Sequence, residues 1–265
     1  MQDLDFPGGK IPLTSQMKFI SEASDKRLPC YRVLNEDGSL ISNTIHEQEE
    51  VAVNMYSAMV TLKTMDTFLY EAQRQGRISF YMTSFGEEAI NIASAAALSP
   101  HDFVLPQYRE AGVLLWRGFT VQECTNQCFG NKDAMKEKEG KCQDGGTSEG
   151  DFHAGLNFAA VMEAPIIFIC RNNGWAISDG VVAKGLGYGI RSIRVDGNDA
   201  IAVYSAIRAA RNMAINENRP ILVERNGWWS EDQESQLCTN VKQQVLQAIK
   251  TAEGMEKSRI ERIVY

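Results

Sequence analysis

The residues that could do chemistry gather in two turns of the second half of the chain. Residues 144–151 read DGGTSEGD, an acidic, glycine-rich turn placed just before a predicted helix. Residues 164–174 read APIIFICRNNG, an apolar strand that runs into an Arg-Asn-Asn-Gly turn. In open α/β sheets, ligands bind beyond the carboxyl ends of the strands, where loops and helix amino termini converge. We therefore expect both turns to lie at the same edge of a sheet.

Together the two turns offer the ligands that a hard cation prefers. Mg²⁺ takes carboxylate, amide and carbonyl oxygens, together with phosphate oxygens of a bound substrate or cofactor. Asp144 provides the carboxylate, Asn173 the amide, and the backbone of Trp175 a carbonyl just beyond the second turn. These three residues are the predicted metal ligands.

Three further residues suit the phosphates that such a cation would hold. Gly145 and Gly146 let the backbone approach a ligand without a Cβ in the way, and the amides that open the following helix favour an anion. Arg171 can add a charge-assisted hydrogen bond to a phosphate oxygen. Either turn alone is a common loop sequence, but the pair, one helix and one strand apart, predicts a site for a metal-bound diphosphate. No G-x-G-x-x-G dinucleotide fingerprint follows a strand.

The elements that must position these turns follow from the hydrophobic periodicity. Capping-box sequences begin at Ser84 and Thr120. Helices are predicted at 48–75, 87–98, 120–128, 149–163, 199–217 and from 230 onward, and strands at 164–170, 192–196 and 220–224. Strands that alternate with helices at these lengths predict an α/β fold with a parallel sheet flanked by helices. We expect residues 1–47 to form an extended arm and residues 48–265 a single domain that ends in a helix.

Composition narrows the class of protein. The formal net charge is −7 and the sequence pI is about 5.2, which argues against a nucleic-acid-binding surface or a basic membrane patch. No apolar run approaches the ~20 residues needed to span a bilayer. The six scattered cysteines are expected to be reduced thiols, buried or partly exposed. The first ten residues read neither as a secretory signal nor as an Arg-rich presequence.

Beyond the two turns, most of the chain resembles a known family. The pattern of an acidic glycine turn, a helix, a strand and Asn-Asn is similar to that of thiamine diphosphate enzymes. Four stretches resemble the alpha subunits of branched-chain 2-oxoacid dehydrogenases, in particular the plant members; they are residues 76–98, 107–118, 144–178 and 187–206. Alpha subunits of pyruvate dehydrogenase, an alternative reading, share the cofactor turn but resemble these stretches less.

The resemblance implies a thiamine diphosphate-binding fold and assigns roles to residues of this chain. Thiamine diphosphate and Mg²⁺ are the implied cofactors. The implied magnesium ligands are Asp144, Asn173 and the Trp175 carbonyl; the implied diphosphate contacts are Gly145, Gly146 and Arg171; and further cofactor contacts are Tyr108 and Arg109. For Tyr108 and Arg109 the residues alone indicate only a loop, so their roles rest on the resemblance.

The resemblance also implies an activity, partners and a location. The activity is that of a 3-methyl-2-oxobutanoate dehydrogenase (lipoyl-transferring), which decarboxylates branched-chain 2-oxoacids in branched-chain amino acid catabolism and passes the acyl group to a lipoyl group. The site lies between alpha and beta subunits of a heterotetramer, which serves a lipoyl-bearing acyltransferase core in the mitochondrial matrix. Because the beta subunit completes the site, we expect the chain alone to be inactive. Nucleic acid and membrane are not among the implied partners.

The sequence departs from the family pattern at three joins, so the fold is expected to be incomplete relative to the family. Gln143 stands where the family has Gly, and the tract that normally precedes it, with its strand, is absent; further tracts are missing after Ser178 and after Glu224. The last of these carries the family's cofactor-contacting His, so the catalytic residue of this chain is unknown. We expect this chain to bind the cofactor weakly or not at all. The alternatives are a non-catalytic subunit that competes for assembly and a chain that folds poorly.

Overall fold

The structure is a computed structural model of the 265-residue chain, and it describes residues 3–4, 10–22, 28–35, 40–41, 49–105, 110–131, 146–172 and 180–226. The chain divides into two compact units. The first comprises Met1–Ala52, Ala96–Asp102 and Gln143–Trp229, and the second comprises Val53–Ala95, Phe103–Cys142 and Ser230–Tyr265.

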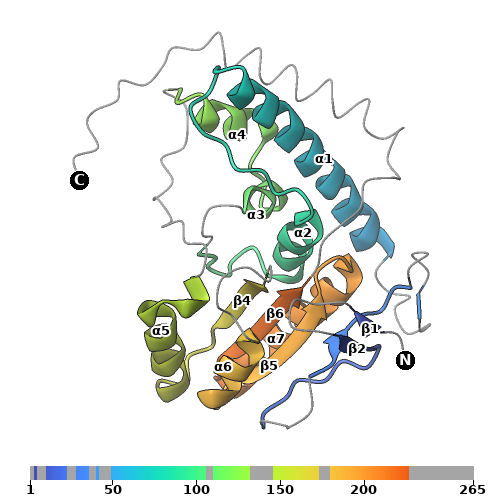
Figure 1. The fold of residues 1–265 in the computed structure, drawn as a ribbon, viewed down its shortest axis with the longest axis vertical. Coiled ribbons are helices and arrows are strands. Elements are labelled where there is room, and N and C mark those ends of the chain that lie inside the picture. The colour runs from blue at the N-terminus through green and yellow to red at the C-terminus, as the bar shows by residue number, and fades with distance from the viewer. Residues whose placement is uncertain are drawn as a thin grey trace. The chain divides into compact units, whose positions relative to one another are not determined.

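The first unit is built on a sheet that has six strands among the described residues. They are β1 (Asp3–Leu4), β2 (Ile11–Thr14), β3 (Cys30–Tyr31), β4 (Ile167–Asn172), β5 (Arg191–Asp196) and β6 (Ile221–Asn226), in the spatial order β1-β2-β3-β5-β6-β4. Only β1 and β2 pair antiparallel within this set; the other four pairs are parallel. The predicted α/β class with a parallel sheet is therefore confirmed (Figure 1).

Helices cover both faces of this sheet. α6 (Val181–Gly187) connects β4 to β5, and α7 (Ala200–Glu217) connects β5 to β6. The two connections step across the sheet in opposite directions, so right-handed crossovers put α6 and α7 on opposite faces. α5 (Gly150–Val161) shares the face of α6, because its Leu156 packs with Cys170, Val182 and Leu222 in one buried cluster. Gly185 permits this packing: a Cβ there would lie 2.5 Å from Ser192 Oγ.

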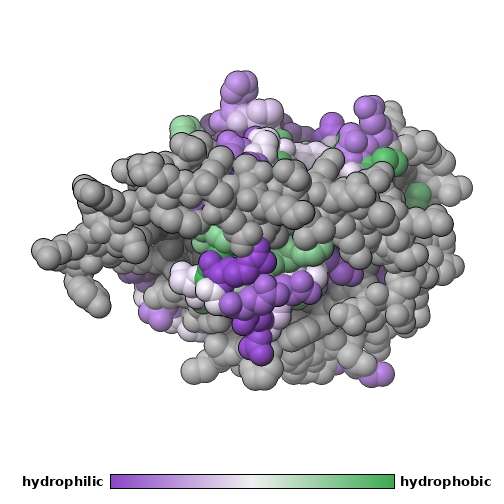
Figure 2. Space-filling view, turned by 90° about the horizontal axis from the view of Figure 1, so that it is seen from above, coloured by the Kyte–Doolittle hydropathy of each residue, from purple (hydrophilic) through white to green (hydrophobic). Residues whose placement is uncertain are grey.

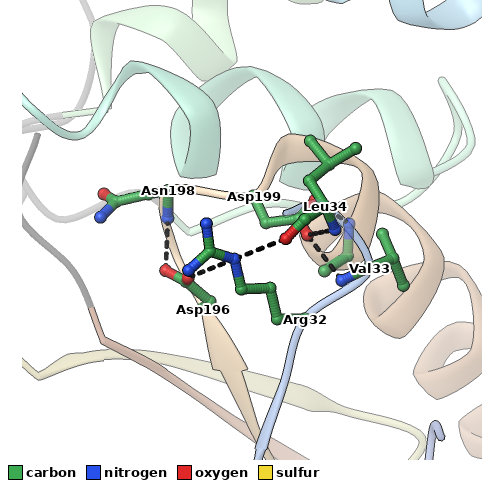
Figure 3. Close-up of polar contacts among 7 residues, drawn as sticks. Arg32, Val33, Leu34, Asp196, Asn198 and Asp199 are labelled. Atoms are coloured by element: carbon green, nitrogen blue, oxygen red, sulfur yellow. Dashed lines mark hydrogen bonds and ion pairs between the residues drawn. The ribbon is translucent and has the colours of Figure 1, made fainter. Parts of the chain in front are cut away.

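A carboxylate at the start of α7 helps to hold the amino-terminal part of the chain at the sheet (Figure 3). Asp199 caps α7, its Oδ1 accepting from the backbone N–H of Ala202 at 2.8 Å. Its Oδ2 accepts from the N–H groups of Val33 and Leu34 at 2.7 and 2.8 Å. The stretch for which the sequence indicates an arm thus contributes strands β1 to β3 to the sheet, while a domain boundary at residue 47 stays a prediction.

The second unit is helical in its described residues. It contains most of α1 (Glu49–Arg74) and α2 (Glu88–Ala97), together with α3 (Ala111–Trp116) and α4 (Val121–Cys128). Leu62, Met65 and Ile92 are fully buried and form part of the core of this unit. A Cβ on Gly112 would lie 2.7 Å from Asn91 Cβ and from Leu62 Cδ2, so only glycine lets α3 approach α1 and α2 this closely.

The capping sequences had different outcomes. Thr120 caps α4 with the predicted reciprocal bonds to Glu123. The prediction for Ser84 is wrong: residues 84–87 form a turn, in which the Glu87 N–H donates to Ser84 O, and α2 begins only at Glu88. The reason is Gly86, whose φ of 75° is left-handed and cannot belong to the first turn of a helix.

The described surface carries some large apolar side chains. Phe158 and Val161 on α5, and Met162, which caps the carboxyl end of this helix, are 66%, 75% and 72% exposed. In the view of Figure 2, most of the described surface is hydrophilic, and smaller areas of it are hydrophobic. None of the helices in the described ranges combines the length and the apolar character needed to cross a membrane.

Candidate functional site

The carboxyl ends of β4, β5 and β6 form one edge of the sheet. Asn172, the last residue of β4, pairs with Asn226, the last residue of β6. Asp196, the last residue of β5, pairs with the same Asn226. Because these strands are parallel and end in register, the chain leaves all three at the same edge of the sheet. Ligands of open α/β sheets bind beyond this edge.

The described part of the acidic glycine turn lies toward this edge. Gly146 begins a short 3₁₀ turn, Gly146–Ser148, and α5 starts at Gly150. The Nζ of Lys184 on α6 donates to Thr147 O at 2.6 Å, and this hydrogen bond holds the turn next to α6. In Figure 1 the amino end of α5 lies at the same end of the first unit as the arrowhead of β4. Both predicted turns therefore begin from the same end of the sheet.

Arg171 and Asn172 belong to β4 itself. The prediction that the strand ends at residue 170 is wrong, because Arg171 and Asn172 pair in register with Arg225 and Asn226 and extend the ladder. Successive strand residues point to opposite faces. Asn172 faces α6, so Arg171 lies on the opposite face from the Gly146 turn, at the same end of the sheet.

A buried carboxylate, which the sequence analysis did not single out, lies directly beneath the edge. Glu224 of β6 has no solvent-exposed surface. Its Oε1 accepts from Asn172 Nδ2 at 2.7 Å, and its Oε2 accepts from the Val182 N–H at 2.9 Å. Arg194 Nη2 lies 3.2 Å from the same Oε2 and balances the charge. A buried charge is tolerated only when it is paired and hydrogen-bonded in this way.

The signal that could have found this residue is its context. Glu224 ends the apolar run PILVE, which the pattern assigns to a buried parallel strand. An acidic residue inside a strand that is covered on both faces needs partners. The sequence, however, does not show that those partners come from β4, β5 and α6.

Cys170 lies next to this carboxylate, one strand away. Burial, reinforced by the charge of Glu224, raises the pKa of the Cys170 thiol to about 12. The thiol therefore stays protonated at physiological pH and is a poor nucleophile or metal ligand. Its buried, reduced state agrees with the expectation for the cysteines, as does that of Cys30 and Cys124.

Another buried carboxylate belongs to the second unit. Asp66 of α1 is fully buried and accepts hydrogen bonds from the Tyr81 hydroxyl and the Ser84 N–H. Burial raises the pKa of Asp66 from its ordinary value of 3.8 to about 7, although both hydrogen bonds act in the opposite direction. This group holds the segment after α1 against the helix.

Most of the predicted site residues lie outside the described residues. They are Tyr108, Arg109, Asp144, Gly145, Asn173 and Trp175. Their roles therefore stay predictions, as does the helix predicted from residue 230. Within the described ranges, no group of three His, Cys, Asp or Glu side chains could hold a metal ion.

The described residues fit the anionic part of a diphosphate. The side chain of Glu149, the residue before α5, makes no capping bond, and the Phe152 N–H donates to Glu149 O at 3.2 Å. The amino end of a helix also carries a positive partial charge, which favours phosphate. The amino end of α5 therefore suits a phosphate group, whereas Arg171 ends β4 on the opposite face of the sheet.

Comparison with known proteins gives the chain a family. The profile of the family described as "Dehydrogenase E1 component" matches residues 56–143 and 141–226. The chain is 51% identical to 2-oxoisovalerate dehydrogenase subunit alpha 1, mitochondrial, of Arabidopsis thaliana, over 97% of this chain and 75% of that protein. It is 47% identical to subunit alpha 2 of the same plant, over 98% and 76%. It is 36% identical to the mitochondrial alpha subunit of Homo sapiens, over 95% and 78%.

The same alignments show that the relatives contain internal residues that this chain lacks. The alignment with Arabidopsis thaliana subunit alpha 1 runs over 353 residues, although this chain has only 265. The family profile also breaks into two matches that meet at residues 141–143, immediately before the acidic glycine turn. The expectation of a chain shorter than its relatives is thus confirmed. On the strength of these matches over nearly its whole length, the chain belongs to the family of dehydrogenase E1 components, alongside the 2-oxoisovalerate dehydrogenase alpha subunits of plants and animals.

Proposed function

We propose that the chain is an alpha subunit of a branched-chain 2-oxoacid dehydrogenase, acting in the oxidative decarboxylation of branched-chain 2-oxoacids. The observation that carries this proposal is the 51% identity, over 97% of the chain, to a protein named 2-oxoisovalerate dehydrogenase subunit alpha 1. The relatives compared here are named mitochondrial, which supports a mitochondrial matrix location.

The cofactor follows from the family, since E1 dehydrogenases depend on thiamine diphosphate. When bound, this cofactor supplies the electron sink for decarboxylation, while the protein supplies binding, orientation and electrostatics. Asp144, Asn173 and the Trp175 carbonyl would hold Mg²⁺. Gly145, Gly146 and Arg171 would hold the diphosphate, and Tyr108 and Arg109 would make further cofactor contacts.

The described residues support this assignment through their arrangement. The glycine turn and the end of β4 start from one end of the sheet. The amino end of α5 carries the positive potential that favours phosphate, while the role of Arg171, which ends β4 on the opposite face of the sheet, rests on the resemblance. This arrangement supports the proposal that an anion would bind at the carboxyl edge of the sheet, next to the predicted metal ligands.

The implied partners complete the enzyme. An alpha subunit of an E1 component acts together with a beta subunit, and we propose that the pair delivers the acyl group to a lipoyl-bearing acyltransferase core. Because the beta subunit completes the site, the chain alone is expected to show no decarboxylation.

The test is calorimetric titration of thiamine diphosphate, with and without Mg²⁺, into the chain co-purified with a plant beta subunit. The same titration with Arabidopsis thaliana subunit alpha 1 provides the reference. We expect binding that requires Mg²⁺ and is at least ~10-fold weaker than the reference, since a tract next to the site is absent. Absence of any Mg²⁺-dependent binding would contradict the proposed cofactor site, and binding as tight as the reference would contradict the expected weakening.

A second candidate function is favoured by the missing internal residues. A chain that keeps most of its family's sequence but lacks residues next to the cofactor turn could occupy a beta subunit without catalysing the reaction. Competition distinguishes the two functions: purified chain is added during assembly of subunit alpha 1 with its beta partner. A fall in dehydrogenase activity in proportion to the chain incorporated supports the competitor, whereas activity of the chain–beta complex itself supports the enzyme.

A further inference from the structure

The residues on either side of the segment between β4 and α6 both contact one buried side chain, that of Glu224. Asn172 is the last residue before this segment, and Val182 is the second residue of the helix that comes after it. The side chain of Asn172 and the backbone N–H of Val182 donate to the two oxygens of the Glu224 carboxylate, at 2.7 and 2.9 Å. Since both oxygens belong to one carboxylate, the two anchors lie within a few ångströms of each other.

We propose that Glu224 is a positioning residue for the diphosphate–metal site, because it joins the described residues that flank the segment with Asn173 and Trp175. This inference rests on the proposed function, which assigns the metal ligands to that segment. Glu224 would touch neither the metal nor the cofactor, and it would act only through Asn172 and Val182.

The surroundings of Glu224 make it suited to this role. Its carboxylate is fully buried, and Arg194 Nη2 lies 3.2 Å from Oε2, so its position is fixed on three sides by β4, β5 and α6. Arg194 is itself held by the carbonyl of Leu28, at 3.1 Å. A carboxylate that is ionised accepts at both oxygens, which is what two donors at its two oxygens require.

The neutral amide of glutamine cannot reproduce this arrangement. In Glu224→Gln one acceptor oxygen becomes an NH₂ group, so either the donors of Val182 and Arg194 face another donor or the Asn172 amide must turn over to present its oxygen. One end of the segment is then released while the volume of the side chain is kept. Substitution of groups that hydrogen-bond to metal ligands and orient them commonly lowers metal affinity 10- to 100-fold.

A matched control is available on the neighbouring strand. Asp196 is also buried and also lies at the carboxyl edge, but it accepts from the Asn198 N–H and pairs with Arg32. Asp196→Asn therefore removes a buried charge from the same edge without touching either anchor of the segment after β4.

The experiment uses the full chain co-purified with its beta subunit and compares the parent with Glu224→Gln and Asp196→Asn. Hydrogen exchange without cofactor reports the Val182 amide, and titration with Mg²⁺ at a fixed thiamine diphosphate concentration reports the half-saturating Mg²⁺ concentration. For Glu224→Gln we expect at least ~10-fold faster exchange at Val182 and an increase of about 10-fold or more in half-saturating Mg²⁺, overcome at high Mg²⁺. Asp196→Asn is expected to leave both readouts near the parent values.

Each alternative result has a distinct meaning. Unchanged exchange at Val182 overturns the anchoring, and faster exchange with an unchanged Mg²⁺ requirement overturns the positioning role. Equal effects of both substitutions overturn the proposal as well, because they indicate general loss of stability. If the parent binds no cofactor, the proposed function fails, and hydrogen exchange still decides whether Glu224 holds the two anchors.

Discussion

At the scale of single residues, buried carboxylates connect parts of the chain that lie far apart in sequence. Asp199 serves the start of α7 and the backbone at Val33 and Leu34. Asp66 joins α1 to the segment after it. Both carboxylates accept hydrogen bonds, and for Asp66 burial opposes the charged form, so its protonation and the stability of the fold are linked.

The clearest consequence is a pH dependence set by Asp66. Its pKa is about 7 in the folded chain, raised by burial from 3.8. Between these values the folded state binds a proton that the unfolded state releases, so this contribution to stability is full below pH ~4 and is lost as the pH rises to ~7. A shift of about three pKa units corresponds to about 4 kcal/mol of unfolding free energy. Urea unfolding from pH 4.5 to 7.5 should therefore show a fall in the parent that Asp66→Asn lacks.

Tyr81→Phe is the companion variant for this prediction. The Tyr81 hydroxyl donates to Asp66 and so favours the charged carboxylate. Its removal should raise the pKa of Asp66 further, so the fall in stability still begins near pH 4 but extends to higher pH. Parallel pH profiles for the parent and Asp66→Asn would contradict the raised pKa.

At the scale of elements, the parts predicted well are those with strong local signals. The sequence from Asp199 to Glu217 has a capping residue and apolar residues at helical spacing, and it forms α7. The apolar runs that became β4, β5 and β6 were found because buried parallel strands are short and rich in branched residues.

The elements that were missed lack such signals. α6 has only seven residues, two of them glycine, and gains its stability from packing of Gly185 against Leu222 and Ser192. β3 has two residues, and its pairing of Cys30 with Arg194 joins positions remote in sequence. In the site, residue types and spacing indicated the two turns, but only the packed fold shows that Glu224 lies beneath them.

Asp199 permits a test of how the amino-terminal strands attach. Asp199→Ser keeps a capping oxygen for α7 but is too short to reach Val33 and Leu34. We expect at least ~10-fold faster hydrogen exchange at those two amides and a loss of about 2 kcal/mol for two hydrogen bonds, with α7 still protected. Asp199→Ala should cost about 1 kcal/mol more, since the cap is lost as well. Equal losses in the two variants would show that capping alone matters.

At the scale of the whole molecule, the chain has features of a subunit. Its relatives are named alpha subunits, and α5 presents Phe158, Val161 and Met162 to solvent on one side. These residues are spaced three and four apart, so they share one face of the helix. Exposed apolar groups that form a continuous patch commonly mark an interaction surface.

We predict that this face of α5 contacts the beta subunit. Phe158→Glu should weaken co-purification with the beta subunit by at least ~10-fold, because it places a charge in an apolar contact, and should leave the melting temperature of the chain nearly unchanged. Ile215→Glu is the control, since Ile215 is also an exposed apolar residue, 48% accessible, but lies on α7. Equal retention of beta subunit by both variants would exclude α5 from the contact.

The assembled molecule also allows the shared metal to be tested directly. The measurement is a double-mutant cycle on Mg²⁺-dependent thiamine diphosphate affinity, with Asp144→Ala, Asn173→Ala and the two combined, in the complex with the beta subunit. If one ion is coordinated by both side chains, each single substitution should reduce the affinity at least ~10-fold, and the pair should lose little more than the worse single variant. Parent-like affinity in either single variant, or losses that simply add, would mean that the two turns do not share a metal ion.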